Sequence, residues 1–417
     1  MKKFLSALMC LAMLTSMVVC GASAEEVITL KVMSGIQMES EAPLERAMAD
    51  AYMAANPNIK IELIPQKVVD VPTVITAMNS SGNLPDIFPM PTQFTVQAKV
   101  MGVAADVREY MSDEFYNSLT PAAIEGVMTD GIMMQVPWTT QPQVLIYRSD
   151  WLADAGMDKI ETMDDFVAAA KAFTKPEEGV YGFAMVGVQN GSGQGRYLQF
   201  VNSFGVREVY QDENGEWKSD LTTDAYRDCL TFFTNLDLVE GVVGPGSTET
   251  GYPEACNLMA TERAGLFITG SNGIGVILKQ NPELAGKLAT CPTPKQVQNC
   301  SQVAVGGYAV SAHTPYKAEA VKYLEFLASP ENSVAYAKAT GRLPVTTTAA
   351  ADPAFQAPEF KGCIEAINVA IPQPAYEGYS EIWDIMGESY NSVLSGVSVD
   401  DAMKQVEKRV AEVLAKY

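Results

Sequence analysis

The chain has 417 residues, of which 50 are acidic and 29 are basic, so its formal net charge is −21. A sequence that is 47% hydrophobic and 19% charged can bury a core, which excludes a chain that is disordered throughout, and its length predicts two domains or three at about 150 residues each. The negative charge argues against a nucleic-acid partner, and the single histidine, His313, excludes an ordinary metal site built from several histidines.

The first residues predict an export signal. Two lysines precede an apolar run over residues 4–19, which is shorter than the about 20 residues that cross a bilayer as a helix. We therefore interpret residues 1–24 as a signal peptide, and we favour cleavage after Ala24 because it ends an A-x-A pattern. The alternative is a lipobox-like segment ending at Cys20, which would carry a lipid anchor. Either route predicts an exported protein at the cell surface or in the periplasm.

Strands and helices alternate from residue 28 onward. Apolar and polar residues alternate over 28–33 and again over 59–64, which predicts two strands. Between them, apolar residues follow helical spacing over 44–55, and Asn56-Pro57 ends that run. A β-α-β order implies a right-handed crossover and a mostly parallel sheet, so the fold class is α/β.

Several later helices are marked by their ends. Thr162 and Asp165 form a weak capping box at the start of one helix. Pro330 and Gly341 bracket another, since proline favours a helix start and glycine a helix end. Apolar spacing over 402–413 predicts a final helix at the C-terminus.

Two glycine-containing segments lie outside these patterns. Asn214-Gly215 predicts a hairpin turn between short strands, because both residue types accept a positive φ. The segment 191–195, with the sequence GSGQG, matches neither a phosphate-binding loop nor the nucleophile elbow of hydrolases. We interpret it as a mobile surface loop.

No catalytic or metal-binding motif is evident, and we expect no cofactor. Five cysteines follow the leader without a C-x-x-C pair, which indicates neither zinc nor a redox dithiol. Cys291 and Cys300 could bridge a loop, and buried free thiols are an equally good alternative. His313 lies at an expected turn, where a solvated surface imidazole is the favoured interpretation. A pair of glycosidase carboxylates is not excluded, but no spacing indicates one.

Segments spread over most of the chain resemble one known family. They are SGNLPDI at 81–87, GVAADV at 102–107, VPW at 136–138, LIYRSDWL at 145–152, TMDDF at 162–166, GGYAVS at 306–311 and GRLPV at 341–345. Together and in this order they resemble the family 1 extracellular solute-binding proteins, the maltose-binding-protein-like receptors of bacterial carbohydrate ABC importers. Arg148 stands where the family usually has Asn, and Met163 stands where it usually has Trp.

The resemblance implies a two-lobed periplasmic-binding-protein-like fold of type II. Each lobe would be a mixed, mostly parallel sheet flanked by helices, and the chain would cross between lobes three times. Lobe one would contain residues 25–137 and 293–329, and lobe two residues 138–292 and 330–417. Such a receptor is not an enzyme: it closes on a carbohydrate, expected here to be an oligosaccharide, and a membrane permease recognises the closed form. We expect a monomer with the permease subunits of an ABC transporter as partners.

The ligand-binding residues are expected at the ends of strands, where side chains can face a cleft. A sugar needs flat aromatic rings for its C–H face and polar groups for its hydroxyls. Ser271 and Asn272 occupy positions where the family often has a stacking aromatic residue. Trp138, Tyr308 and Trp383 could instead be packing residues, and Arg342 could cap the preceding helix. The full set of candidates is Gln37, Glu39, Thr92, Gln93, Trp138, Gln141, Ser271, Asn272, Tyr308, Arg342 and Trp383.

Two other functions compete with a carbohydrate receptor. A receptor for another solute, such as a polyamine, would suit an acidic chain, but it needs carboxylates boxed by aromatic residues, and Glu39 is the only obvious candidate. A secreted glycoside hydrolase is the alternative from another class, and it would release new reducing ends from an oligosaccharide.

Overall fold

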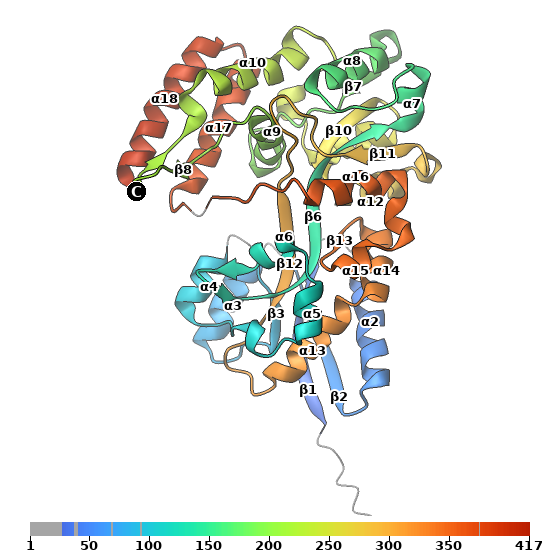
Figure 1. Ribbon diagram of the computed structural model, residues 1–417, viewed down its shortest axis with the longest axis vertical. Helices are drawn as coiled ribbons and strands as arrows, with labels where there is room; N and C mark the ends of the chain where they lie inside the picture. The colour runs from blue at the N-terminus through green and yellow to red at the C-terminus, as the bar shows by residue number, and fades with distance from the viewer. Residues whose placement is uncertain (1–26, 37–40, 68–69, 92–93, 375) are drawn as a thin grey trace, which may run out of the picture.

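The structure is a computed structural model that describes residues 27–36, 41–67, 70–91, 94–374 and 376–417. Figure 1 shows two bodies, called here the first and the second lobe, which the long strand β6 (Val136–Arg148) joins. The strands follow one path through both lobes in the order β2-β1-β3-β12-β6-β10-β7, with β11 and β13 also paired to β6. Helices flank this mixed sheet, which confirms the predicted α/β class.

The first lobe begins with the predicted β-α-β unit. β1 (Ile28–Ile36) and β2 (Ile59–Lys67) pair in parallel, and α2 (Glu41–Ala55) connects them. Leu30 and Val32 of β1 are buried against Met48 and Tyr52 of α2, as their spacing predicts. The other elements of this lobe are α3 (Val71–Ser80), β3 (Ile87–Pro89), α4 (Thr95–Met101), η3 (Val107–Glu109), α5 (Asp113–Ser118), α6 (Pro121–Glu125), β4 (Met128–Thr129), β5 (Ile132–Met133), β12 (Val303–Val310) and α13 (Lys317–Leu327).

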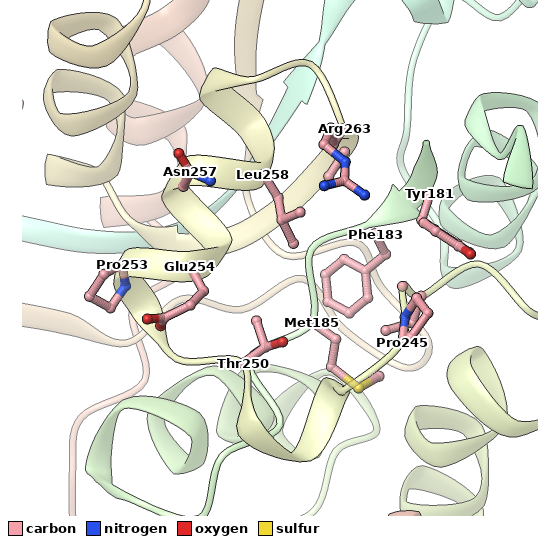
Figure 2. A pocket seen from close by; sticks show the side chains of 13 residues that line it. Tyr181, Phe183, Met185, Pro245, Thr250, Pro253, Glu254, Asn257, Leu258 and Arg263 are labelled. Atoms are coloured by element: carbon pink, nitrogen blue, oxygen red, sulfur yellow. The ribbon is translucent and has the colours of Figure 1, made fainter. Parts of the chain in front are cut away.

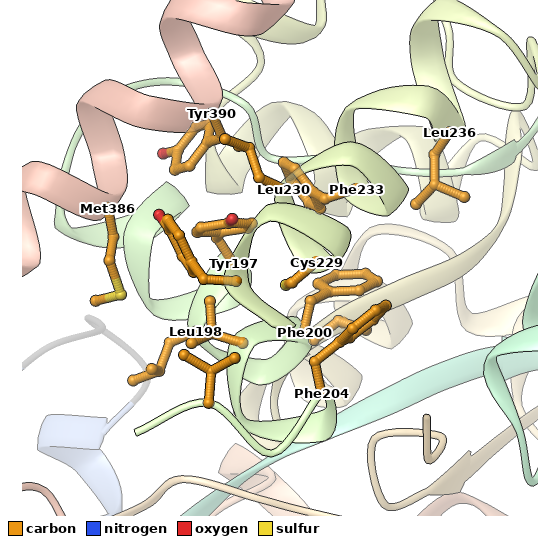
Figure 3. Packing of buried hydrophobic residues seen from close by; sticks show 14 of the residues in the cluster. Tyr197, Leu198, Phe200, Phe204, Cys229, Leu230, Phe233, Leu236, Met386 and Tyr390 are labelled. Carbon is orange, nitrogen blue, oxygen red and sulfur yellow. The ribbon is translucent and has the colours of Figure 1, made fainter. Parts of the chain in front are cut away.

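The second lobe is built on an aromatic core between three helices. Figure 3 shows side chains of α9 (Gly191–Ser203), α10 (Asp224–Leu238) and α17 (Tyr379–Leu394) meeting there. The ring of Tyr197 lies 4.8 Å from that of Phe233 and 4.9 Å from that of Tyr390, between centroids. All three rings are at most 2% exposed, so α9 is held firmly against its neighbours.

The remaining elements of the second lobe surround this core and its sheet. They are α7 (Ser149–Asp154), α8 (Met163–Phe173), η4 (Pro176–Glu178), β7 (Tyr181–Phe183), β8 (Tyr210–Gln211), β9 (Trp217–Lys218), η5 (Asp220–Thr222), η6 (Ser247–Glu249), α11 (Tyr252–Ala260), β10 (Ala264–Gly270), α12 (Asn272–Gln280), η7 (Pro282–Leu284), β11 (Leu288–Cys291), η8 (Pro353–Gln356), α16 (Pro358–Ile367) and α18 (Val399–Lys416).

Strand β6 is shared between the two lobes. Residues 136–142 pair with β12 of the first lobe, and residues 143–147 pair with β10 of the second, both antiparallel. The register with β12 shifts between Gly306 and Gly307, which marks an irregularity beside the crossing. α14 (Pro330–Thr340), β13 (Leu343–Pro344) and α15 (Thr347–Ala350) follow next to this strand.

Several predicted element ends are confirmed. Thr162 and Asp165 form both bonds of the capping box of α8. α14 starts at Pro330 and ends at Gly341, whose φ of 73° is the left-handed conformation that glycine adopts without strain. The hairpin turn also forms, since β8 and β9 pair on either side of Gly215 with its φ of 80°.

The interpretation of residues 191–195 as a surface loop is wrong. They form the first turns of α9, and Asn190 caps the helix by accepting hydrogen bonds from the backbone N–H groups of Ser192 and Gly193. A Cβ on Gly193 would lie 2.1 Å from the carbonyl oxygen of Val188. Glycine is therefore needed there for close packing, although it weakens the helix locally.

All five cysteines of the described residues are free thiols, so Cys291 and Cys300 are not bridged to each other. His313 is exposed, in agreement with the interpretation as a surface side chain. Within the part of the chain that the structure covers, every helix is too short or too polar to span a bilayer.

The segment 293–300 packs on the second lobe before the chain enters β12. The backbone N–H of Lys295 donates to the carbonyl oxygen of Glu161 at 2.9 Å, and that of Val297 donates to Ser203 at 2.8 Å. The N–H of Ser301 then bonds to the carbonyl oxygen of Val369 at 3.1 Å. The exact lobe boundaries stay a prediction, and these bonds bear on where the second crossing is drawn.

Candidate ligand-binding site between the lobes

The strand ends of the two lobes point toward each other. β10 ends at Gly270, which lies opposite Gln143, where β6 enters the second lobe. In the first lobe, Pro89 at the end of β3 lies opposite Tyr308, and β1 runs parallel to β3. The carboxyl ends of these strands therefore face the crossing, which is where ligands bind in open α/β sheets.

Four of the predicted ligand residues follow β1 and β3 in the sequence. Gln37, Glu39, Thr92 and Gln93 lie outside the described residues, so their placement stays a prediction. Gln141 is described: it lies in β6 opposite Ala304 of β12 and is partly exposed.

Trp138 and Tyr308 are buried together in the first lobe. They are 5% and 4% exposed, and their ring centroids lie 5.5 Å apart. Tyr336 of α14 packs against Trp138 at 4.4 Å, and the indole N–H of Trp138 donates to the carbonyl oxygen of Leu327 at 3.3 Å. In this conformation both residues serve as core packing between β6, β12 and α14.

A buried charge cluster lies next to these rings. Nη2 of Arg342 is 2.7 Å from Oε1 of Glu41 in the first turn of α2. Glu45, one turn further along the helix, is also buried, and burial raises its pKa to about 7 even though Ser34 hydrogen-bonds to it and Arg342 attracts it. The Arg342–Glu41 ion pair connects the start of α2 to the segment that follows α14.

Three predicted residues that are distant in sequence meet at this point. The backbone of Gly341 packs closely on two of them, since a Cβ there would lie 2.7 Å from the carbonyl oxygen of Ser271 and 3.0 Å from Cα of Asn272. Arg342 is the next residue in the chain. The side-chain amide of Asn272 donates to the hydroxyl of Tyr252 at 3.3 Å. Ser271 is buried, whereas Asn272 and Tyr252 are partly exposed.

Arg196 is a residue of this region that the sequence analysis missed. Its Nη1 donates to the carbonyl and hydroxyl oxygens of Ser192, both at 2.8 Å, and its Nη2 donates to Oγ1 of Thr269 at 2.7 Å. The guanidinium carbon lies 4.8 Å from the ring centroid of Tyr252. Burial lowers the pKa of Arg196 to about 10, which leaves it charged at neutral pH. The signal that could have found it was its position directly after the glycine-rich segment 191–195.

Trp383 lies on the other side of the first turns of α9. A Cβ on Gly195 would lie 3.7 Å from the indole ring, and the ring of Tyr379 is 5.8 Å away. Trp383 is only partly buried, unlike Trp138. Of the two predicted tryptophans, Trp383 is therefore the one whose ring has surface left for a ligand. It lies apart from the cluster around Arg342.

A separate pocket opens beside the edge strand β7, and its lining includes Thr250 and Pro253, which flank Tyr252 in sequence. Figure 2 shows it between β7, α11 and the loop around Pro245. Its volume is about 420 Å³, and Tyr181, Phe183, Glu254 and Arg263 are among the lining residues. None of the predicted ligand residues that the structure describes lines it. In the part of the chain that the structure describes, no group of three or more His, Cys, Asp or Glu side chains is arranged to hold a metal ion.

Comparisons with known proteins agree on one family. A profile of the bacterial extracellular solute-binding proteins matches residues 36–334. A putative binding protein of Brucella abortus is 22% identical over 381 residues, which is 90% of this chain and 90% of that protein. The melibiose/raffinose/stachyose-binding protein of Bacillus subtilis is 22% identical over 405 residues, 92% of this chain and 90% of that protein. The structure of the sugar-binding protein MalE from Xanthomonas citri superposes with a TM-score of 0.78 at 18% identity and covers 93% of this chain and 98% of that one, so the two share a fold.

Proposed function

The chain belongs to the bacterial extracellular solute-binding protein family, and from this membership we propose that it is the exported receptor of an ABC importer, which captures a carbohydrate between its two lobes. The observation that carries the proposal is the continuous strand β6, whose halves pair with different lobes. A pair of lobes that share strands in this way can hinge while each sheet stays intact. We propose an oligosaccharide as the solute, in keeping with the name of the melibiose/raffinose/stachyose-binding relative from Bacillus subtilis.

Closure by the solute is a shift between two populations. A solute that contacts both lobes binds the closed form better than the open form and therefore favours closure. The register shift at Gly306 and Gly307 provides backbone freedom next to the crossing. No bond of the solute is broken, so the protein acts as a receptor and not as an enzyme. A micromolar dissociation constant, about −8 kcal/mol, would allow both capture and release.

The proposed site uses the strand ends that face the crossing. Trp383 would stack on the sugar ring, and Asn272 and Gln141 would bind hydroxyls, because each is partly exposed. Gln37, Glu39, Thr92 and Gln93 would complete the site from the first lobe. Trp138, Tyr308, Ser271 and Arg342, all buried, would shape it from behind. The division implied by the resemblance, 25–137 with 293–329 and 138–292 with 330–417, remains part of the proposal. The pairing of residues 136–142 with β12 favours a first crossing near Gln143, and the bonds of residues 293–300 to the second lobe favour a second crossing near Ser301.

The proposal includes the setting in which the receptor works. Residues 1–24 would direct export, and Cys20 would carry a lipid if the lipobox-like route is used. The closed monomer would deliver its solute to the permease subunits of an ABC transporter. Mass spectrometry of the exported chain tests the first part, since cleavage after Ala24 and a lipid on Cys20 give different masses.

A saccharide panel tests the function. We expect one or a few oligosaccharides to raise the melting temperature and to reduce the radius of gyration measured by X-ray scattering, with no new reducing ends after long incubation. Released reducing ends would instead identify a glycoside hydrolase. Stabilisation by polyamines alone would identify a receptor for a different solute, and a rigid molecule indifferent to all of these solutes would refute the proposal.

A further inference from the structure

Arg196 is a partly exposed cation with no ion pair to any carboxylate of the described residues, in a chain that has 50 acidic residues. The buried arginines of the described residues are paired: Arg148 with Asp150 and Glu262, and Arg342 with Glu41. The groups around Arg196 are neutral, namely Ser192, Thr269 and the rings of Tyr252 and Phe267. Withdrawing a charge from water without an opposite charge is costly, and the guanidinium is still partly exposed, so a negative partner from outside could reach and compensate it.

The position of Arg196 is suited to such a partner. Thr269, which it contacts, immediately precedes Gly270 at the end of β10 that faces the first lobe. α11 begins at Tyr252 and α12 at Asn272, and these two side chains are hydrogen-bonded to each other. The positive ends of two helices are therefore close to the guanidinium, and they add to its attraction for an anion.

The hydrogen bonds of the guanidinium leave one of its edges unused. Nη1 donates two hydrogen bonds to Ser192, and Nη2 donates one to Thr269. Nε has no hydrogen-bond partner. In a guanidinium, the N–H of Nε and one N–H of Nη2 lie on the same edge of the plane, and such a pair matches the two oxygens of a carboxylate. Nε is covered in this conformation, so a bidentate contact requires a small shift of neighbouring side chains.

We propose that Arg196 binds an anionic substituent of the solute, so that the receptor prefers an acidic saccharide with a carboxylate, such as a uronic acid residue. This inference rests on the proposed function. A carboxylate suits the site better than a phosphate. The single positive charge of Arg196, with the hydroxyl of Tyr252 near it, balances the one negative charge of a carboxylate, whereas a phosphate dianion needs more donors. The net charge of −21 does not prevent this, since salt screens surface charge beyond about 8 Å at physiological ionic strength.

Matched pairs of probes test the inference on the purified chain. Trigalacturonate is compared with galactotriose, and cellobiouronate with cellobiose, by calorimetry and thermal shift at pH 7. We expect the acidic member of at least one pair to bind tighter by about tenfold or more, the size expected for a charge-assisted contact. R196Q should remove the preference, R196K should keep part of it, and high salt should reduce it. R263Q, which changes an arginine of the pocket beside β7, should leave it unchanged.

Each outcome is decisive. Equal affinity for acidic and neutral members, or binding of neutral sugars alone, would overturn the inference and leave the proposed function standing. A preference that survives R196Q in a folded variant would remove Arg196 from the site. Equal or better binding of sulfated saccharides would overturn the choice of a carboxylate. If R196Q does not fold, the preference of the unchanged protein and its salt dependence still decide. If no saccharide of any kind binds, the proposed function fails and the inference falls with it.

Discussion

Nη2 of Arg342 lies 2.7 Å from Oε1 of Glu41, and the two side chains are 6% and 0% exposed. The two residues are far apart in sequence, and their contact joins the start of α2 to the segment after α14. Removing one member of a buried ion pair leaves the other charge uncompensated, which commonly costs about 3–5 kcal/mol.

We therefore expect R342M to lower the free energy of unfolding by about 3 kcal/mol. The reason is that Glu41 would lose its ion pair with Arg342, and Glu45 would lose the attraction of the same cation. Urea unfolding at pH 7 measures the change. R46M serves as a control, because Arg46 is an exposed residue of the same helix. A loss below about 1 kcal/mol would mean that the pair contributes little.

Stability should fall as the pH rises from about 4.5 to 7. Burial raises the pKa of Glu45 to about 7 from an ordinary value of 4.5, and the pKa of Glu208 in the second lobe is also raised to about 7 by burial. Well below pH 4.5 each of these carboxyl groups is protonated in the folded and in the unfolded chain alike. Between pH 4.5 and 7 the unfolded chain releases the proton while the folded chain keeps it, so each residue costs up to about 3 kcal/mol of stability by pH 7.

The variants E45Q and E208Q separate the two contributions. Each should flatten part of the pH dependence measured by urea unfolding between pH 4.5 and 7, and the double variant should flatten most of it. The groups facing Glu45 are Ser34, Glu41, Tyr308 and Arg342, and all of them stay in place in E45Q. An unchanged slope in the double variant would show that both residues are solvated in the folded protein.

The two predicted tryptophans should behave differently when they are replaced. W383A should weaken binding of the preferred saccharide by at least about 1 kcal/mol and leave the fold intact, because the side chain is partly exposed at the lobe-facing end of α17. W138A should instead lower the free energy of unfolding by about 3–5 kcal/mol, since Trp138 is packed between Tyr308 and Tyr336. Titration calorimetry and denaturant unfolding distinguish the two effects. Normal affinity in W383A would remove Trp383 from the site.

The glycines at the start of α9 provide a matched pair of substitutions. G193A should destabilise the protein by about 2 kcal/mol or more, because the new Cβ would lie 2.1 Å from the carbonyl oxygen of Val188 and 2.5 Å from the hydroxyl of Tyr390. G191A should be neutral or stabilising by up to about 1 kcal/mol, since nothing lies within 4 Å of its Cβ position. Thermal unfolding of both variants checks this. Equal stability would imply that this turn of α9 is not closely packed.

The sequence by itself determined the local elements and the family. The β-α-β start, the capping box at Thr162 and the glycine end of α14 each depend on residues within a few positions of one another, so periodicity and capping chemistry were enough to predict them. The family resemblance likewise needed only short segments in the right order.

Only the tertiary structure decided which residues meet. The glycine-rich segment is helical although glycine weakens a helix, and at Gly193 a side chain would meet Tyr390 of α17 and Val188; no local rule contains that information. The backbone of Gly341 approaches Ser271 and Asn272, and Arg196 lies beside the end of β10 with no ion pair to a carboxylate of the described residues. Burial and partners depend on contacts between residues far apart in the chain. For that reason the sequence could propose candidates for the site, whereas the arrangement of their charges had to come from the fold.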